Sequence, residues 1–225
     1  MSPSTLSPRQ ILFYQFIGFS FLLITHIGAV LAILNFNFTL FISSIIYWQI
    51  TASLGISVCY HRYCTHKSYE VNRHLKCLLL FCGCLAGQLG PMRWTRVHRV
   101  HHNHADEDLD PHSPRHGFIH SHFGWLLQLK RRAKNPHLHK WPKDLLKDTD
   151  IVFFEKAFPW IQLSSWVAFY IVAGLDGVLW LGFFRICITL HSIWSINSFG
   201  HSLGYTNFKL KDDSRNQLIY ALFAA

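Results

Sequence analysis

Long apolar stretches alternate with short polar connections along this chain. From Ile11 to Tyr60 there is no Asp, Glu, Lys or Arg, a charge-free run far longer than a buried segment of a soluble protein needs. Within this charge-free run, the turn-forming residues 35–37 divide the apolar sequence into two stretches. We therefore predict two membrane-spanning helices, residues 11–34 and 38–60, each long enough to cross a hydrocarbon core of about 30 Å.

A second apolar pair follows later in the chain. Residues 157–175 and 178–196 are separated by Asp176-Gly177, a turn-forming dipeptide. Because each hairpin returns to the side that it left, all polar connections at the open ends face one compartment. The pattern predicts an all-α membrane protein with four transmembrane helices in two hairpins.

The apolar stretch of residues 75–90 is shorter and carries Lys76 and Gln88. If it crossed the membrane, the histidine motifs before and after it would face opposite compartments. We therefore expect it to dip into the membrane or to lie along the interface as an interfacial helix. Residues 61–156 form a histidine-rich cap in this scheme, and residues 1–225 form one domain.

The positive charge is concentrated in this cap. Fifteen of the 21 Lys and Arg residues lie between His61 and Asp150, within a net charge of +9. Positively charged loops favour the cytoplasmic face, so we expect an integral, multi-pass protein with its histidines on that side. A nucleic-acid binder is excluded, because a charge-free run of fifty residues does not remain in water. A lipid surface, an anionic substrate or an acidic redox partner suits the basic face.

Three groups of polar residues next to the apolar segments are candidate metal ligands. His98, His101 and His102 have the i, i+3, i+4 spacing that shares one face of a helix, and Asn197 and His201 are four apart. Neutral imidazoles with few acidic ligands suit a transition metal. His61 and His66 are five apart, which suits a straight helix poorly, so we expect the second span to end near His61 and the chain to bend.

The remaining histidines are weaker candidates. His104 points away from the helical face of its neighbours, and His191 is expected to be a polar packing group or an outer hydrogen-bond partner of the metal ligands. The loop that follows has two interpretations: it supplies outer hydrogen-bond partners of the metal ligands, or it is a polar loop at the mouth of the site. Its members are His112, His116, His120 and His122, with Asp106, Asp108 and Asp110.

Several motifs together resemble the membrane fatty acid desaturases, in particular the acyl-CoA delta-9 (stearoyl-CoA type) branch. They run in the family's order from about residue 50 onward. The matching pieces are His61–Tyr69, Trp94–His102, Asp110–Ser113, Gly117-Phe118, Ser121–Leu127, Asn197–Gly204 and Asp212–Asn216.

This resemblance implies a di-iron centre that uses dioxygen and two electrons to desaturate a fatty acyl chain, with acyl-CoA favoured and a cis double bond at delta-9. The electrons come from a separate donor, a b-type cytochrome or a ferredoxin. The implied iron ligands are His61, His66, His98, His101, His102 and His201, with Asn197 acting through water.

The resemblance also implies substrate contacts. Gln88, Trp94 and Trp194 match positions that bend the acyl chain, and Arg96 and Lys130 are candidates for contact with phosphates. The chain departs from the acyl-CoA pattern in having apolar residues where that branch has polar ones, so acyl lipids and acyl carrier protein thioesters stay open. These departures are Leu89, Val97, Leu129 and Ile193.

The family normally has a last histidine box, HNxHH, after the segment that matches Asp212–Asn216, and the sequence stops at Ala225 before such a box. We therefore expect a C-terminally truncated desaturase domain. The alternatives are a di-iron hydroxylase of acyl chains or lipids, an inactive desaturase remnant, and a non-catalytic membrane metal binder.

Overall fold

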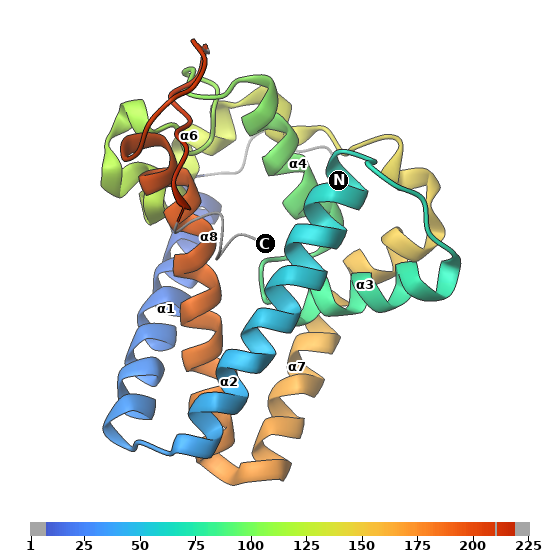
Figure 1. Ribbon diagram of the computed structural model, residues 1–225, viewed down its shortest axis with the longest axis vertical. Coiled ribbons are helices and arrows are strands. Elements are labelled where there is room, and N and C mark those ends of the chain that lie inside the picture. The colour runs from blue at the N-terminus through green and yellow to red at the C-terminus, as the bar shows by residue number, and fades with distance from the viewer. Residues whose placement is uncertain (1–7, 210, 219–225) are drawn as a thin grey trace. The chain divides into compact units, whose positions relative to one another are not determined.

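The computed structural model describes residues 8–209 and 211–218, and this part of the chain is built from helices. Its β-structure consists of an isolated bridge between Tyr205 and Asn216, without strands. In chain order the elements are α1 (Pro8–Leu34), α2 (Phe38–Ile50), η1 (Thr51–Thr65), α3 (Arg73–Leu85), α4 (Pro91–Asn103), η2 (Pro114–His116), η3 (His120–Gly124), α5 (Trp125–Leu127), α6 (Leu129–Lys134), η4 (Pro136–His139), η5 (Leu145–Lys147), α7 (Thr149–Gly177), η6 (Val178–Phe184) and α8 (Arg185–Ser202), as Figure 1 shows.

Within the described residues, three helical segments are long and apolar enough to cross a membrane: Leu12–Leu34, Phe38–Thr65 and Thr149–Ser202. The turn predicted at residues 35–37 is confirmed, because α1 ends at Leu34 and α2 starts at Phe38. The Asn37 side chain caps α2 by accepting a hydrogen bond from the backbone N–H of Leu40 at 3.1 Å. The helical, membrane-type architecture is thus confirmed, and the number of four spans stays a prediction.

The third segment is 54 residues long, and a straight helix of that length would extend about 80 Å. Its helical geometry breaks at Ala173 and Gly174, and Gly174 has φ 59°, a left-handed conformation that glycine adopts at low cost. The break lies just before the predicted hinge at Asp176-Gly177. The two sides of the break then pack together: the rings of Trp166 and Phe183 lie 4.6 Å apart.

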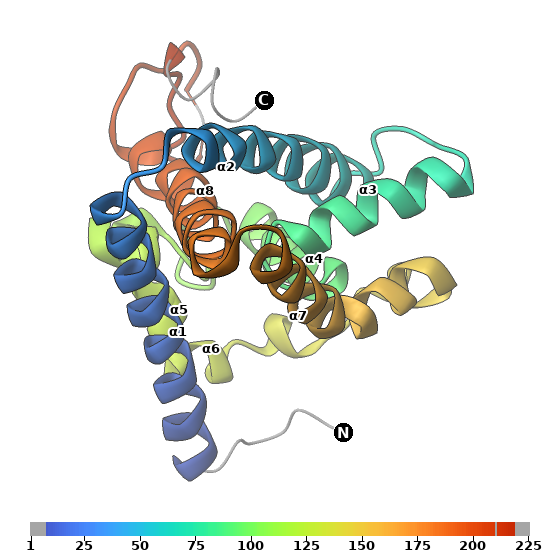
Figure 2. The same cartoon turned by 90° about the horizontal axis from the view of Figure 1, so that it is seen from below.

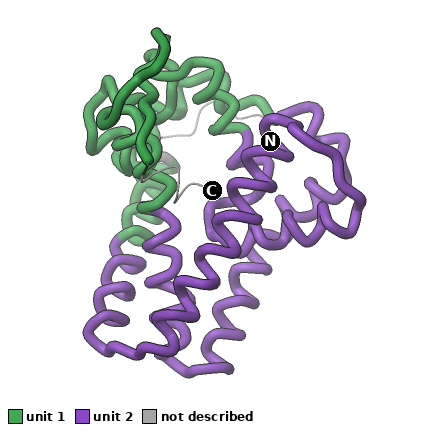
Figure 3. Tube along the Cα trace, viewed as in Figure 1, with its two compact units in different colours: residues 1–22, 96–141, 191–225 green, residues 23–95, 142–190 purple. Residues whose placement is uncertain are grey.

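The chain divides into two compact units, each assembled from separate stretches (Figure 3). Unit 1 comprises residues 1–22, 96–141 and 191–225, and unit 2 comprises residues 23–95 and 142–190. The one-domain organisation of residues 1–225 stays a prediction.

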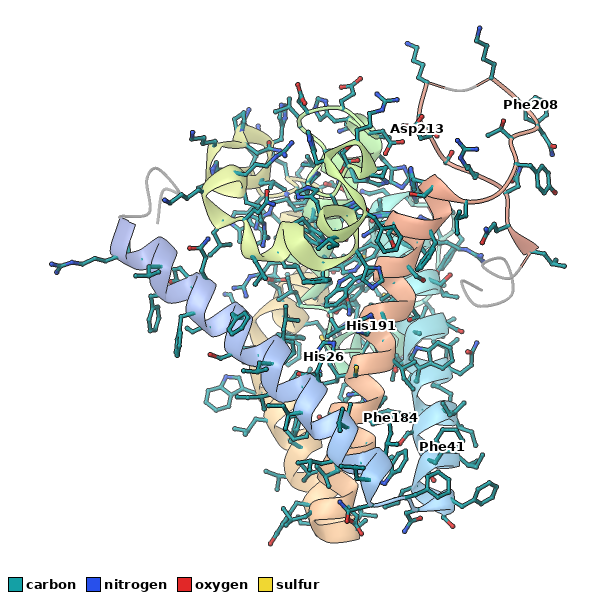
Figure 4. All side chains as sticks on the ribbon, turned by 90° about the vertical axis from the view of Figure 1, so that its left-hand side faces the viewer. His26, Phe41, Phe184, His191, Phe208 and Asp213 are labelled. Carbon is teal, nitrogen blue, oxygen red and sulfur yellow. The ribbon has the colours of Figure 1, made fainter. Side chains whose placement is uncertain are left out.

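In unit 2, η6 packs against both α2 and α7 (Figure 2). Aromatic rings fill this contact: Trp180 of η6 is buried, and its ring lies 5.8 Å from those of Phe36 and Phe41. The rings of Phe41 and Phe184, labelled in Figure 4, lie 6.0 Å apart.

Helix α3 packs closely on η1 and also contacts α7 in unit 2, and Figure 1 shows it lying crosswise to the direction of α7. Two glycines allow this contact. A Cβ atom on Gly55 would lie 2.5 Å from the backbone nitrogen of Gly83, and one on Gly83 would lie 2.3 Å from the Tyr60 ring. With 13 residues, α3 is about 20 Å long, too short to cross a membrane. Its expected place at the interface stays a prediction.

Ion pairs fix the start of α3 to the start of α7. Lys76 Nζ lies 2.8 Å from Asp148 and 2.9 Å from Asp150, and Arg73 lies 2.9 Å from Asp150. Asp148 also caps α7 by accepting a hydrogen bond from the backbone N–H of Asp150 at 3.0 Å. One carboxylate therefore serves both the helix terminus and the contact between helices.

Unit 1 gathers the end of α4, the loop after it, the short helices η2 to α6 and the end of α8. Gln15 of α1 donates a hydrogen bond to the carbonyl of Leu127 at 2.8 Å. The segment after α8 returns to this unit through Asp213, which pairs with Arg115 at 2.8 Å. Figure 4 labels Asp213 and the exposed Phe208 on this segment.

Candidate metal centre

His61 and His66 of unit 2 are brought together by the backbone. The chain was expected to bend between His61 and His66, and this expectation is wrong: η1 continues to Thr65 with π-helical geometry. The end of the second membrane span near His61 stays a prediction. The backbone N–H of His66 donates to the carbonyl of His61 at 3.1 Å, the i to i+5 bond of a π-helix. Residues five apart therefore share a face, and the two Nε2 atoms lie 3.2 Å apart.

In unit 1, the last turns of α4 carry the second histidine group. The Nε2 atoms of His98 and His102, which are four residues apart, lie 3.0 Å from each other. The ring centroid of His101 lies 5.4 Å from that of His102, so the predicted shared face is confirmed. His101 is buried, whereas His102 is exposed.

The buried carboxylate of Asp110 orients His101. It accepts hydrogen bonds from His101 Nδ1 at 2.9 Å, from the Asp106 backbone N–H at 2.9 Å and from the His112 backbone N–H at 3.0 Å. Burial alone would raise the pKa of Asp110, but the His101 bond and the nearby imidazoles lower it to about 2. The carboxylate is thus ionised at neutral pH and holds the Nδ1 proton of His101, which leaves Nε2 free to bind a metal.

Asp106 does the same for His201 at the end of α8. Its Oδ2 atom accepts hydrogen bonds from His201 Nδ1 at 3.0 Å and from the backbone N–H of Asp213 at 2.6 Å. Burial opposes ionisation, yet these two hydrogen bonds lower the pKa of Asp106 overall. The ring centroids of His201 and His101 lie 5.7 Å apart, so the two tethered imidazoles are neighbours.

His112 belongs to this cluster, although the sequence did not single it out as a ligand. Its ring centroid lies 4.3 Å from that of His101. Potential ligand atoms of His101, Asp110 and His112 all lie within 4.8 Å of one another. Burial, with His101 nearby, lowers the pKa of His112 to about 3, so this imidazole is neutral at neutral pH and can serve as an acceptor or a ligand. The signal in the sequence was its place directly after Asp110-Pro111.

In the loop after α4, Asp106 and Asp110 hydrogen-bond to the candidate ligands His201 and His101, as the first of the two interpretations expects. That these histidines bind a metal stays a prediction. The histidines further along have other partners. His122 Nδ1 lies 2.8 Å from Ser198 Oγ, and His122 Nε2 lies 3.0 Å from His191 Nδ1. His104 Nδ1 lies 3.3 Å from Glu107, outside the cluster, as expected.

The candidate substrate residues lie at separate places in the two units. In unit 2, the Trp94 ring lies 5.9 Å from that of Tyr60, and Gln88 is half-buried in the turn after α3. In unit 1, the Arg96 guanidinium lies 4.5 Å above the Trp141 ring, and Lys130 is exposed on α6.

Two further candidates lie on the last turns of α8. Trp194 is buried, with its ring 5.5 Å from that of His191, and Asn197 is half-buried. The substrate and metal roles of all these residues stay predictions.

The donor set suits a transition metal. Imidazole nitrogens provide the donors, and carboxylates hold the other ring nitrogen of His101 and His201, the arrangement that fixes the tautomer of a metal-binding histidine. Imidazole suits iron, zinc and copper, whereas magnesium and calcium prefer oxygen. The residues present therefore fit an iron centre.

Comparison with known proteins identifies the family of this chain. The family described as "Fatty acid desaturase" matches residues 39–224. The chain is 37% identical over 199 residues to an sn-1 stearoyl-lipid 9-desaturase of Anabaena variabilis, covering 87% of this chain and 72% of that protein.

Two further relatives show the range of related enzymes. The chain is 31% identical over 194 residues to an sn-1 stearoyl-lipid 9-desaturase of Synechocystis sp., covering 85% of this chain and 60% of the relative. It is 33% identical over 209 residues to an icosanoyl-CoA 5-desaturase of Limnanthes douglasii, covering 90% of this chain and 58% of that protein. The chain thus spans between 58% and 72% of the length of these three proteins. Because the family match covers most of the sequence and the relatives are desaturases, this oxidoreductase chain belongs to the fatty acid desaturase family.

Proposed function

We propose that this protein is a di-iron, oxygen-dependent fatty acyl desaturase that introduces a cis double bond at delta-9 of a saturated chain. One observation carries the proposal: buried, ionised carboxylates hold the Nδ1 atoms of His101 and His201, in a chain of the desaturase family. An enzyme that removes hydrogens from unactivated methylenes needs an oxidant that ordinary side chains do not supply. Bound iron would provide it, with dioxygen as co-substrate.

The proposed iron ligands are the histidines of the three motifs. They are His61, His66, His98, His101, His102 and His201, with Asn197 acting through water. Support comes from the facing Nε2 atoms of the His61–His66 pair and of the His98–His102 pair, and from the carboxylate tethers of the other two. His112 is an additional candidate because of its place beside His101.

The protein's own groups have defined tasks in this reaction. Asp110 and Asp106 keep a proton on the Nδ1 atoms of their histidines, so that Nε2 stays unprotonated. We propose that Gln88, Trp94 and Trp194 shape the path of the acyl chain and that Arg96 and Lys130 face its polar head. Each turnover removes two hydrogens from the substrate and consumes one dioxygen, two electrons and two protons, releasing two waters. The electrons come from a separate b-type cytochrome or ferredoxin.

The carrier of the acyl chain is best proposed as a membrane lipid. Acyl-CoA was favoured by the motifs, yet the relatives from Anabaena and Synechocystis are named stearoyl-lipid 9-desaturases. The replacement of polar residues by Leu89, Val97 and Leu129 in this chain agrees with a substrate other than acyl-CoA. One relative is named an icosanoyl-CoA 5-desaturase. An acyl-CoA thioester is therefore the competing proposal for the substrate of this protein.

The proposed topology has four spans. The break at Ala173 and Gly174 and the packing of Trp166 on Phe183 support a second hairpin within the 54-residue segment. We propose that α3 lies at the membrane interface and that the histidine motifs face the cytoplasm, where the basic cap meets anionic headgroups and the electron donor.

The direct test expresses the full gene in a host that lacks a delta-9 desaturase, with stearate in the medium. We expect oleate in the lipids by gas chromatography with mass spectrometry. Hydroxy acids without alkenes would identify a hydroxylase instead. In isolated membranes, labelled stearoyl lipid should be converted faster than stearoyl-CoA, and the reverse result would restore acyl-CoA as the substrate.

Metal analysis separates catalysis from simple binding. We expect about two irons per chain and oxygen consumption that depends on substrate and electron donor. Zinc without oxygen consumption would indicate a non-catalytic metal binder. Iron without turnover would indicate an inactive remnant.

A further inference from the structure

The turn between α3 and α4 in unit 2 has a strained backbone. Gly87 and Leu89 both have φ 76°, in the left-handed region. Glycine accepts this conformation readily, whereas a leucine pays for it in steric crowding. Strained residues persist where the surrounding structure holds them, and they concentrate at functional sites.

The carbonyl groups of this turn are held by side chains from other elements. Arg185 of α8 donates from Nη1 to the carbonyl of Leu85 at 2.9 Å, and Gln162 of α7 donates from Nε2 to the carbonyl of Cys84. The hydroxyl of Tyr60 in η1 donates to the carbonyl of Leu89 at 3.3 Å. Carbonyls at the end of a helix have no partner further along the helix, so the donors from Arg185 and Gln162 complete the end of α3, and the Tyr60 hydroxyl holds the turn that follows it.

The amide groups at the start of α4 are held as well. The carboxylate of Glu155 in α7 accepts hydrogen bonds from the backbone N–H groups of Met92 at 2.9 Å and Arg93 at 3.3 Å. A Cβ atom on Gly90 would lie 2.3 Å from this carboxylate, so a larger residue has no room there. Glu155 therefore caps α4 from a different helix, in the role of an N-cap side chain.

Arg185 is the most unusual of these groups. It is fully buried, its guanidinium lies 4.6 Å above the Tyr47 ring, and its Nε donates to the carbonyl of Leu181 at 2.7 Å. An arginine in a membrane-type helix is costly to bury, and such residues commonly have a functional role. Its long reach to the end of α3 indicates that this role concerns the turn.

Gln88 lies in the middle of this held turn. Its Nε2 atom is buried and makes no hydrogen bond to the residues that the structure describes. A buried amide donor without a protein acceptor costs free energy unless a ligand or water meets it. The strained turn thus presents a buried amide donor with spare hydrogen-bonding capacity.

We propose that Arg185, together with Gln162 and Glu155, acts as a positioning device that fixes Gln88 and thereby determines which carbon pair of the acyl chain is desaturated. This inference rests on the proposed function and adds a determinant of double-bond position to it. Arg185 does not need to touch the substrate, because it acts through the backbone of the turn.

The test compares Arg185→Met with Arg185→Lys in the full chain. Methionine keeps much of the length and removes the donors as well as the buried charge, so it lowers the cost of burial and keeps the helices packed. We expect Arg185→Met to raise the fraction of double bonds at neighbouring positions about tenfold over the wild type. Arg185→Lys retains one donor and should restore part of the selectivity.

Arg73→Met is the matched control, because it removes an exposed arginine from the opposite end of α3. It should keep the wild-type product pattern. A second measurement, hydrogen exchange followed by mass spectrometry, should show faster exchange in residues 85–93 of Arg185→Met and unchanged exchange in α2.

The outcomes separate the two proposals. Absence of any unsaturated product from the wild type would contradict the proposed function. A wild type that desaturates, with an Arg185→Met variant that loses rate but keeps one double-bond position, would reduce Arg185 to a structural role. Unchanged exchange in the turn would overturn the inference as well.

Discussion

The two units position their candidate metal-binding histidines in two different ways. In η1 the backbone positions the histidines: a π-helical turn brings His61 and His66, five residues apart, to an Nε2 separation of 3.2 Å. In unit 1, buried carboxylates position the histidines: Asp110 accepts a hydrogen bond from Nδ1 of His101, and Asp106 accepts one from Nδ1 of His201. The first device sets distance, and the second sets ring orientation and tautomer.

Removing an imidazole should have the largest effect. His101→Ala should abolish desaturation and lower the iron content, because a methyl group cannot fill a vacant coordination position. Iron analysis and product analysis on the same preparation measure both effects. His104→Ala is the control, since His104 bonds to Glu107 outside the cluster and its variant should retain iron. Full turnover by His101→Ala would refute the ligand assignment.

Changing the register of η1 should have the second-largest effect on iron binding. Insertion of one alanine between Tyr63 and Cys64 makes the two histidines six residues apart and removes the i to i+5 relation. We expect iron affinity to fall about 100-fold, measured by competition with a chelator. The same insertion between Asn35 and Phe36, in the turn before α2, serves as the control. Equal losses from both insertions would show that the register of η1 is not the cause.

Neutralising a carboxylate that holds a histidine by its Nδ1 atom should have a smaller effect on iron affinity. Asp110→Asn replaces an acceptor of three hydrogen bonds by a group that can donate to His101, which favours the wrong tautomer. Iron affinity should fall about 10- to 100-fold. Asp108→Asn provides the matched control, because that side chain is 98% exposed, and it should bind iron as the wild type does.

The effect of Asp106→Asn should be smaller than that of Asp110→Asn. Its Oδ2 atom receives two hydrogen bonds, one of them from the backbone of Asp213 rather than from a histidine. We expect iron affinity to fall about tenfold, with additional proteolysis of residues 205–216 because the contact with Asp213 is lost. A larger loss than in Asp110→Asn would reverse the order of importance of the tethers.

An exposed ion pair should have the smallest effect. The Arg115–Asp213 pair measures 2.8 Å, but its side chains are 50% and 40% exposed. Arg115→Ala should lower the free energy of unfolding by about 0.5 kcal/mol and leave iron binding unchanged. A thermal unfolding scan and metal analysis test this, and a loss of iron would mean that the segment after α8 contributes to the centre.

The sequence predicted elements whose signals are local. The charge-free run and residues 35–37 gave the first two helices and the turn between them, and Asn37 caps α2 as turn chemistry suggests. The i, i+3, i+4 spacing gave the shared face of His98, His101 and His102 on α4. These features depend on helix periodicity and on capping, which neighbouring residues determine.

Other features depend on contacts between distant residues. Asp106 and His201 are 95 positions apart, so no local pattern marks the carboxylate as a tether. The π-helix has no strong propensity signal, and a span ending at His61 was the simpler expectation from α-helical periodicity. The break before the predicted hinge likewise follows from Gly174, whose left-handed conformation the packing of the helices selects.

Gly55 illustrates how a residue without functional groups can limit a proposed metal site. It lies in the same π-helix as the histidine pair, and its missing side chain lets η1 touch the backbone of α3. An added methyl group would meet main-chain atoms of Cys82 and Gly83, which have no rotamer to change. A mutational screen for iron loading should therefore find alanine at position 55 nearly as harmful as loss of an imidazole, although the affected site lies more than one helical turn away.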